Sequence, residues 1–119
     1  MKPKEVLLRL VFMLAAVLVF TFFDWIVHSS WYYLAVPSWY FPHKIIYGTL
    51  WAFLASLVFR KLRIPAQAAA ITIITVVLLQ IRYAIYGYPL LFHAIVLGEH
   101  LIFLYGATYF ALKLMRKFT

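Results

Sequence analysis

The sequence predicts an all-α, polytopic membrane protein, a single four-transmembrane-helix bundle over residues 1–119 with the N and C termini in the cytoplasm. Three observations predict this fold class. The chain is 67% hydrophobic with a mean hydropathy of +0.97. Its apolar residues gather in four segments joined by short connections, and its basic residues fall almost wholly in alternate connections. Only 12% of the residues are charged, against about a quarter in soluble domains.

Four helices are predicted, over about residues 6–27, 43–59, 64–83 and 90–112. An α-helix needs about 20 residues to cross a membrane, so the second segment is short for a span. Arg9 lies near enough to the start of the first helix for its side chain to reach the headgroups. Pro65 suits the first turn of the third helix. Residues 29–42 are rich in Trp, Tyr and Pro and fit an interfacial loop or a short surface helix.

The basic residues predict the orientation of these helices. Nine of the 11 lie at one predicted membrane face: Lys2, Lys4, Arg9, Arg60, Lys61, Arg63, Lys113, Arg116 and Lys117. By the positive-inside rule this face is cytoplasmic, which predicts a multi-pass protein of the cell membrane. The net charge is +8, but the basic clusters are short and adjoin apolar segments. We therefore expect the basic residues to contact the headgroups of the lipid bilayer, and we expect no binding of nucleic acid.

Aromatic residues crowd the opposite face, where they are expected to anchor the bundle in the membrane interface. They are Trp25, Trp31, Tyr32, Tyr33, Trp39, Tyr40 and Phe41 around the first hairpin, and Tyr83, Tyr86 and Tyr88 around the second. Small residues recur on the second helix (Gly48, Ala52, Ser56) and the fourth (Ala94, Gly98, Gly106). Such faces predict close packing of both helices against their neighbours.

The few ionisable residues within the apolar segments are the candidates for function. Asp24 and His28 are four residues apart and therefore share one helix face. Counted along the helices at 1.5 Å per residue, His43 and His93 lie at the same level, near the outer membrane boundary. We therefore predict a metal site made of Asp24, His28 and His93, with His43 as a possible fourth ligand.

Two or three histidines with one carboxylate suit zinc, copper or iron, although the identity of the cofactor stays unknown from the sequence. The chain has no cysteine, which excludes thiolate ligands and disulfides. One variant is a single haem held between His28 and His93. One alternative is a structural network in which Asp24 pairs with Arg82, which lies at the same predicted depth. Another is that Asp24 and His28 conduct a proton or an ion.

The Asp-x3-His step at Asp24 and His28, followed by His43 at the start of the next helix, is similar to a known motif. It resembles the outer-face copper-site motif in the third subunit of membrane methane and ammonia monooxygenases. The resemblance covers residues 24–43 alone, in a much shorter chain. It implies copper as the metal at these residues.

Glu99 and His100 lie near the predicted middle of the membrane, where an ionisable pair indicates function. We assign them the catalytic role, as a general base or a proton relay. Arg82 shares a helix face with Thr75, and both are candidates for binding a cofactor or an anionic group. Arg82 is also expected to pair with Asp24 or Glu99.

These residues leave three functions open. The first is a membrane protein with an outward-facing metal, redox-cofactor or proton-relay site that acts on a lipid-soluble substrate. The second is a small oligomeric transporter or channel unit for an ion or a proton. The third is a non-catalytic accessory subunit of a larger membrane complex. The partners beyond the bilayer are accordingly other copies of the chain or the subunits of such a complex, and whether the protein is an enzyme stays open.

Overall fold

The computed structural model describes all 119 residues and contains only helices. The long helices are α1 (Pro3–Ser30), α2 (Tyr40–Val58), α3 (Ile64–Ile85) and α4 (Leu90–Met115). Two single-turn 3₁₀ helices, η1 (Tyr32–Leu34) and η2 (Arg116–Phe118), follow α1 and α4. The all-α fold class is confirmed, and of the two alternatives for residues 29–42, a loop or a short helix, the structure has a loop with one three-residue helix, η1.

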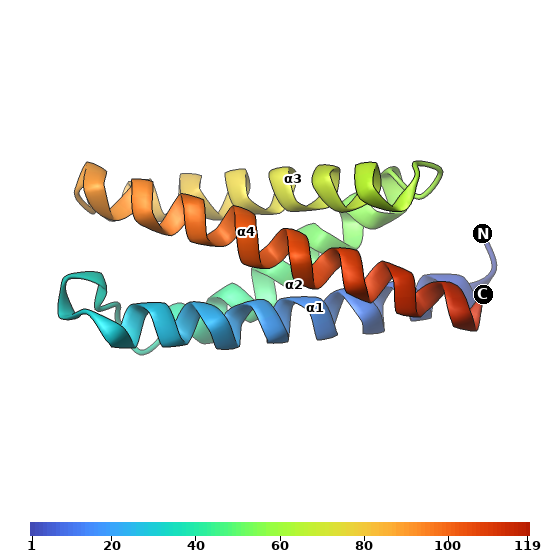
Figure 1. Ribbon diagram of the computed structural model, residues 1–119, viewed down its shortest axis with the longest axis horizontal. Coiled ribbons are helices and arrows are strands. Elements are labelled where there is room, and N and C mark those ends of the chain that lie inside the picture. Colours follow the sequence, from blue (N-terminus) through green and yellow to red (C-terminus); the bar gives the residue numbers. More distant parts are fainter.

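The four helices run alternately up and down, so both termini lie at the same end of the molecule (Figure 1). α1 packs against α2 and α4, and α3 packs against the same two helices from the other side. The molecule measures 44 × 20 × 19 Å along its principal axes. The connections are too short for two consecutive helices to run in the same direction, so consecutive helices are antiparallel neighbours.

Proline marks the start of every long helix. Pro3 and Pro65 occupy the first turns of α1 and α3, Pro42 lies in the first turn of α2, and Pro89 is the N-cap of α4. A proline is tolerated there because the N–H that it lacks would have no partner within the helix. These residues set where each helix begins.

Three helical segments are long and apolar enough to cross a membrane: Pro3–Ser30, Ile64–Ile85 and Leu90–Phe118. α2 is not among them, although it packs beside α1 and α3. Large apolar side chains are exposed on the outer faces of the long helices, as on α1 at Leu7, Val11, Leu18, Phe22 and Trp25. The surface of the bundle is thus apolar over much of its length.

The core changes in character along the bundle. Toward the termini it is formed by a large apolar cluster with many alanines: Met13, Ala16, Val17, Ala52, Ala55, Ala68, Ile71, Ala111, Leu112 and Met115. Three smaller apolar clusters lie toward the opposite end. Between and beside these smaller clusters lie the buried ionisable residues.

The small-residue face of α2 packs closely, whereas that of α4 does not. Gly48, Ala52 and Ser56 are all buried, and a Cβ at Gly48 would lie 3.3 Å from Cγ1 of Val17 on α1. A Cβ added at Gly106 on α4 would have no such neighbouring atom within 4 Å. The expected close packing is therefore confirmed for α2 and wrong for the glycines of α4.

Gly48→Val is therefore expected to destabilise the bundle by about 1–3 kcal/mol, because the added methyl groups overpack the contact between α1 and α2. Gly106→Val is the matched control, since it adds the same atoms where there is open space. Thermal unfolding of both purified variants in detergent measures the difference. Equal stability of the two variants would contradict the close approach at Gly48.

Candidate functional site

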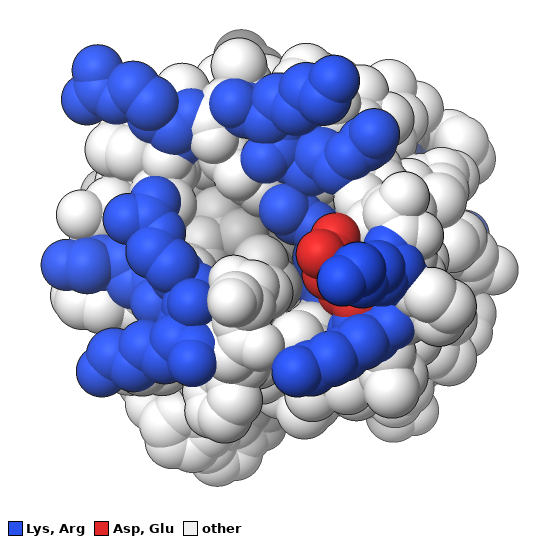
Figure 2. Space-filling model, turned by 90° about the vertical axis from the view of Figure 1, so that its right-hand side faces the viewer, with Lys and Arg blue, Asp and Glu red and all other residues white.

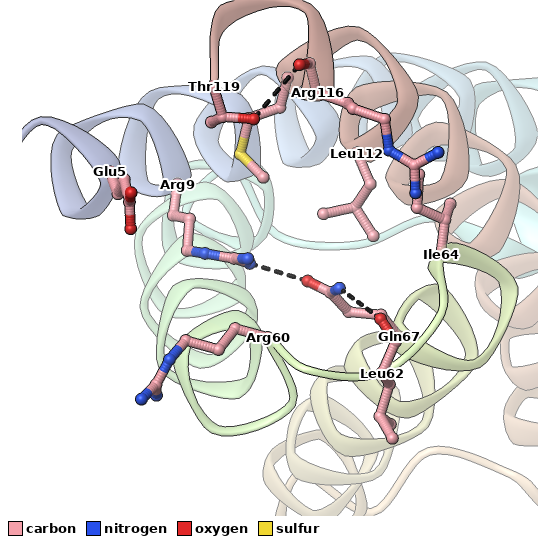
Figure 3. Close-up of a pocket in the computed structure, with 10 residues that line it drawn as sticks. Glu5, Arg9, Arg60, Leu62, Ile64, Gln67, Leu112, Arg116 and Thr119 are labelled. Atoms are coloured by element: carbon pink, nitrogen blue, oxygen red, sulfur yellow. Dashed lines mark hydrogen bonds between the residues drawn. The ribbon is translucent and has the colours of Figure 1, made fainter. Parts of the chain in front are cut away.

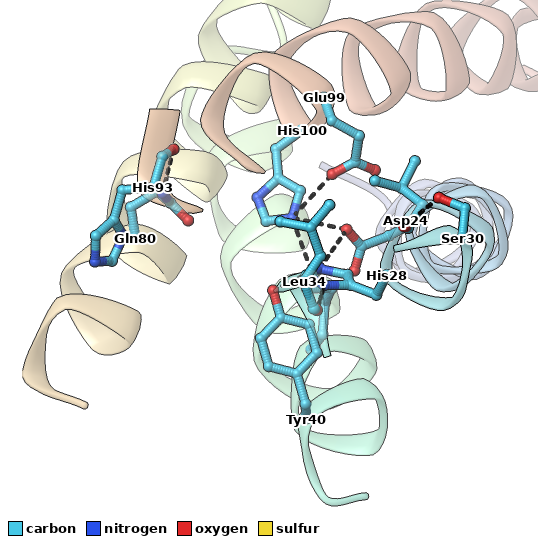
Figure 4. Close-up of polar contacts among 11 residues, drawn as sticks. Asp24, His28, Ser30, Leu34, Tyr40, Gln80, His93, Glu99 and His100 are labelled. Atoms are coloured by element: carbon cyan, nitrogen blue, oxygen red, sulfur yellow. Dashed lines mark hydrogen bonds and ion pairs between the residues drawn. The ribbon is translucent and has the colours of Figure 1, made fainter. Parts of the chain in front are cut away.

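Three side chains in the buried interior bring potential metal ligands together. Nε2 of His28 lies 3.2 Å from Oδ1 of Asp24, and Nε2 of His100 lies 3.1 Å from the same oxygen. The three ligand atoms all lie within 4.8 Å of one another. Figure 4 shows His28 and Asp24 on α1 facing His100 on α4. Two imidazole nitrogens thus converge on one carboxylate oxygen.

Local geometry explains this convergence. Asp24 and His28 share a face of α1 because they are four residues apart. Side chains on a helix lean toward its N-terminus. Asp24 therefore leans toward the end with the termini, while His100 on the antiparallel α4 leans the opposite way. The two side chains approach each other although their backbone positions differ in depth.

His28 is held in one orientation by its second ring nitrogen. Nδ1 of His28 lies 2.5 Å from the backbone oxygen of Leu34 in η1. Because a carbonyl oxygen only accepts, Nδ1 carries the proton and donates it. In the neutral ring the lone pair of Nε2 then faces Asp24, and this buried nitrogen has no hydrogen-bond partner. Metal-bound histidines are held in the same way, by donation from their other ring nitrogen to a carbonyl or carboxylate.

Lys44 on α2 supplies the positive charge at this cluster. It is 1% exposed. Its ammonium donates to Oδ2 of Asp24 and, at 2.9 Å, to the hydroxyl of Tyr40, and Nζ lies 2.8 Å from Nε2 of His100. Nζ also lies 4.2 Å from the centroid of the Tyr40 ring, a favourable cation–π contact. A buried ion pair between Asp24 and Lys44 therefore links α1 to α2.

Glu99 adds a second carboxyl group beside His100. Its Oε2 lies 3.4 Å from Nε2 of His100, yet neither of its oxygens has a hydrogen-bond partner. With both carboxylates ionised and Lys44 protonated, Asp24, Glu99 and Lys44 carry a summed charge of −1. One further proton would balance this charge, whereas a divalent metal ion bound beside protonated Lys44 would leave the site with a charge of +1.

We call Asp24, His28, Lys44, Glu99 and His100 the buried polar cluster. Neither Lys44 nor Tyr40 was assigned to the site from the sequence. Lys44 is one of the two basic residues outside the nine at the other face, and Tyr40 was expected at the membrane interface. Two signals pointed to them. Tyr40 and Lys44 are four residues apart at the start of a helix, and a carboxylate buried in an apolar bundle requires a positively charged partner.

The other predicted metal ligands lie apart from this cluster. Nδ1 of His43 lies 2.9 Å from a guanidinium nitrogen of Arg82. Figure 4 shows His93 beside Gln80, well away from Asp24. The backbone oxygen of His93 accepts a long hydrogen bond from Gln80. The structure therefore groups His100, in place of His93, with Asp24 and His28.

Arg82 and Thr75 also have surroundings other than those expected. Arg82 makes no ion pair with Asp24 or Glu99. Instead it bonds to His43 and its guanidinium stands 4.6 Å from the centroid of the Tyr47 ring. Thr75 is fully buried, and its hydroxyl has no hydrogen-bond partner. The structure brings neither residue into hydrogen-bonding contact with the buried polar cluster.

Two of the aromatic residues expected at the membrane interface are buried instead. Tyr40 and Tyr83 are nearly inaccessible, and their ring centroids are 4.8 Å apart. Tyr32 and Trp31, in contrast, are exposed as the interface prediction requires. The buried tyrosines form a wall of the site beside Lys44.

Comparison with known proteins found no matching family, no matching curated protein and no matching solved structure. The copper-site motif suggested by residues 24–43 also lacks its geometry here, because His43 is bonded to Arg82 and does not join Asp24 and His28. What the chain does must therefore be argued from its own residues.

Proposed function

We propose that the chain is a multi-pass protein of the cell membrane in which all four helices span the bilayer and both termini are cytoplasmic. Nine basic residues gather at the end that holds the termini, and Figure 2 looks onto this end. Under the positive-inside rule that end faces the cytoplasm. Three helices have the length and hydropathy of spans, which supports the same arrangement.

The assignment of α2 as the fourth span rests on its packing. With 19 residues it is about 29 Å long, close to the thickness of the hydrocarbon core. It lies antiparallel between α1 and α3 and therefore shares their depth. Its lower hydropathy is partly due to Lys44, whose charge is buried against Asp24 and is not presented to lipid.

Within this bundle, Asp24, His28 and His100 bind a divalent transition-metal ion, for which zinc, copper and iron are the candidates. The observation that carries this proposal is the convergence of two histidine nitrogens on one carboxylate oxygen, at 3.2 and 3.1 Å. The ligands of a tetrahedral zinc ion, with bonds of about 2.0–2.1 Å, lie about 3.3 Å from one another. Two of the three separations are thus close to those of a metal site before any ion enters, and the third is no more than 4.8 Å.

Three protein ligands leave a further coordination position for water or substrate, as in catalytic metal sites. Glu99 lies beside His100 and is suited to accept a proton from a group bound there. Because the exterior of the bundle is apolar, a molecule reaching this site from the membrane would be lipid-soluble. This part of the proposal follows from the placement of Glu99.

Proton transfer is the second candidate function, and Lys44 is the observation that favours it. Its ammonium lies 2.8 Å from the His100 nitrogen that a metal would need. Lys44, His100 and Asp24 are in hydrogen-bonding contact with one another, and Glu99 lies 3.4 Å from His100, so the four groups are placed to exchange one proton. A metal ion, in contrast, would have to displace the ammonium from His100.

Zinc binding by the purified chain distinguishes the two. We expect about one zinc per chain, and removal of a ligand in His28→Ala or His100→Ala should weaken binding by at least about 100-fold. His93→Ala and His43→Ala are the matched controls, because these histidines lie outside the cluster, and they should bind as the wild type does. Elemental analysis after dialysis and zinc-dependent thermal stabilisation give the two readouts.

A wild-type chain that binds no metal would overturn the metal site. Weaker binding in the two control variants than in His28→Ala would do the same. If zinc, copper and iron all fail to bind, proton flux into liposomes that is lost in Glu99→Gln would support the second function. The membrane topology is tested separately, by accessibility of cysteines introduced at each end of the bundle.

A further inference from the structure

A second polar site lies at the opposite end of the bundle from Tyr40, where the chain termini are. It is a cavity of about 300 Å³ between the ends of α1, α3 and α4 and the connection from α2 to α3 (Figure 3). The polar side chains on its walls include Glu5, Arg9, Arg60, Gln67 and Arg116. A cavity of this size is at the small end of the range for ligand pockets.

Arg9 reaches from α1 across this cavity toward α3 (Figure 3). One of its terminal nitrogens donates to the side-chain oxygen of Gln67 at 2.7 Å and to the backbone oxygen of Ser56 at 3.0 Å. Gln67 is buried, and its own amide nitrogen donates to the backbone oxygen of Leu62. The Arg9 guanidinium is therefore held in place, while its other N–H groups have no protein partner.

The charge around the cavity is unbalanced. Three arginines, Arg9, Arg60 and Arg116, line it together with one acid, Glu5. None of the three forms a salt bridge, because the only lysine or arginine paired with a carboxylate anywhere in the chain is Lys44. In Figure 2 basic side chains surround the hollow at this end of the molecule.

A neighbouring hollow has the same character. It measures about 260 Å³ and is lined by Arg63, Lys113 and Arg116, with no acidic residue. Arg116 lines both hollows. Positive charge without carboxylate partners thus continues from one to the other.

We propose that the cavity around Arg9 binds a phosphate group, carried either by a membrane lipid or by a free phosphate compound. The planar guanidinium offers paired N–H donors that match two oxygens of a phosphate. Gln67 presets this geometry, and Arg60 and Arg116 add the charge that a dianionic group requires. The site is independent of the metal proposal, because Arg9 and Asp24 are 15 residues apart on α1, about 22 Å.

The test measures phosphate binding to the full chain with three probes. They are inorganic phosphate, nanodiscs that contain phosphatidic acid, and nanodiscs of phosphatidylcholine alone. For the probe that binds, Arg9→Lys and Arg116→Gln should weaken binding by about tenfold or more, because a hydrogen-bonded charge is lost or misplaced. Lys61→Gln, at an exposed residue that lines neither hollow, is the matched control and should change binding by less than about fivefold.

Each outcome decides the proposal. Binding of inorganic phosphate identifies a site for a free phosphate compound, while binding of phosphatidic acid without inorganic phosphate identifies a lipid headgroup site. Wild-type binding in folded Arg9→Lys would overturn the proposal, since Arg9 would then not hold the phosphate. A loss in Lys61→Gln as large as the loss in Arg9→Lys would also overturn it, since only general surface charge would then matter. The proposal is overturned as well if neither inorganic phosphate nor phosphatidic acid binds more strongly than phosphatidylcholine, whose phosphate carries a choline. Arg116→Gln keeps the test valid if Arg9→Lys does not fold, because Arg116 is exposed.

Discussion

Asp24→Ala is expected to lower the free energy of unfolding by about 3–5 kcal/mol, the usual effect of removing one partner of a buried ion pair. Lys44 is 1% exposed and makes its only ion pair with Asp24. Without this carboxylate, the ammonium would stay in an apolar bundle and would be hydrogen-bonded only to a hydroxyl and an imidazole. Denaturant unfolding in detergent micelles measures the change.

A double variant is the control for this prediction. Asp24→Leu combined with Lys44→Met removes both charges and keeps similar volumes, and such replacements are often neutral or stabilising. The double variant should therefore regain most of the stability lost in Asp24→Ala. If Asp24→Ala lost less than about 1 kcal/mol, the ion pair would not hold α1 to α2 as its geometry indicates.

Lys44→Met is expected to raise the affinity for zinc by at least about tenfold and to make the stability of the chain depend on zinc. Two unit charges about 4 Å apart repel by about 4 kcal/mol at an effective dielectric constant of 20, so the ammonium opposes a metal ion at His100. Without metal, Asp24 is left unpaired and the variant should unfold more easily than the wild type. With zinc bound, the metal supplies the missing positive charge.

This prediction depends on the proposed metal site and is measured as the thermal shift produced by zinc. Lys113→Met is its control, because it also removes a lysine ammonium but at an exposed position on α4. The zinc shift should grow in Lys44→Met and stay unchanged in Lys113→Met. A zinc shift no larger in Lys44→Met than in the wild type would count against the metal site and favour the proton-transfer function.

The helices themselves could be predicted closely because their signals are local. Prolines and polar connections bound each apolar segment, and the helices observed begin and end within three residues of the expected positions. The spacing of Asp24 and His28 likewise placed them on one face without any tertiary information. Gly48, Ala52 and Ser56 marked the close contact of α2 for the same reason.

Partners on different helices could not be predicted in this way. Counting residues placed Asp24 level with His93 and left His100 deeper in the membrane. α1 continues to Ser30, six residues past Asp24, or about 9 Å, whereas His100 lies about 15 Å from the start of α4. The side chain of Asp24 leans toward the termini and that of His100 leans the opposite way, which accounts for much of the remaining difference in depth.

The ion-pair partner of Asp24 also could not be predicted from residue positions along the chain. Arg82 was expected to neutralise Asp24, but Arg82 bonds to His43 on α2 and Lys44 takes its place. Both cations lie toward the same end of the bundle, so depth could not separate them. Lys44 and Arg82 differ in which face of the helix they occupy relative to α1. That face depends on how α2 and α3 are rotated in the bundle.

Hydropathy, proline positions and charge are properties of consecutive residues, so they were enough to predict a bundle of apolar helices with its positive charge at one end. The meeting of Asp24, His28, Lys44 and His100 became visible only in the folded bundle, as did the cavity whose arginines make no salt bridge. Such contacts depend on the depth, the rotation and the lean of side chains on separate helices, and these are set by how the helices pack.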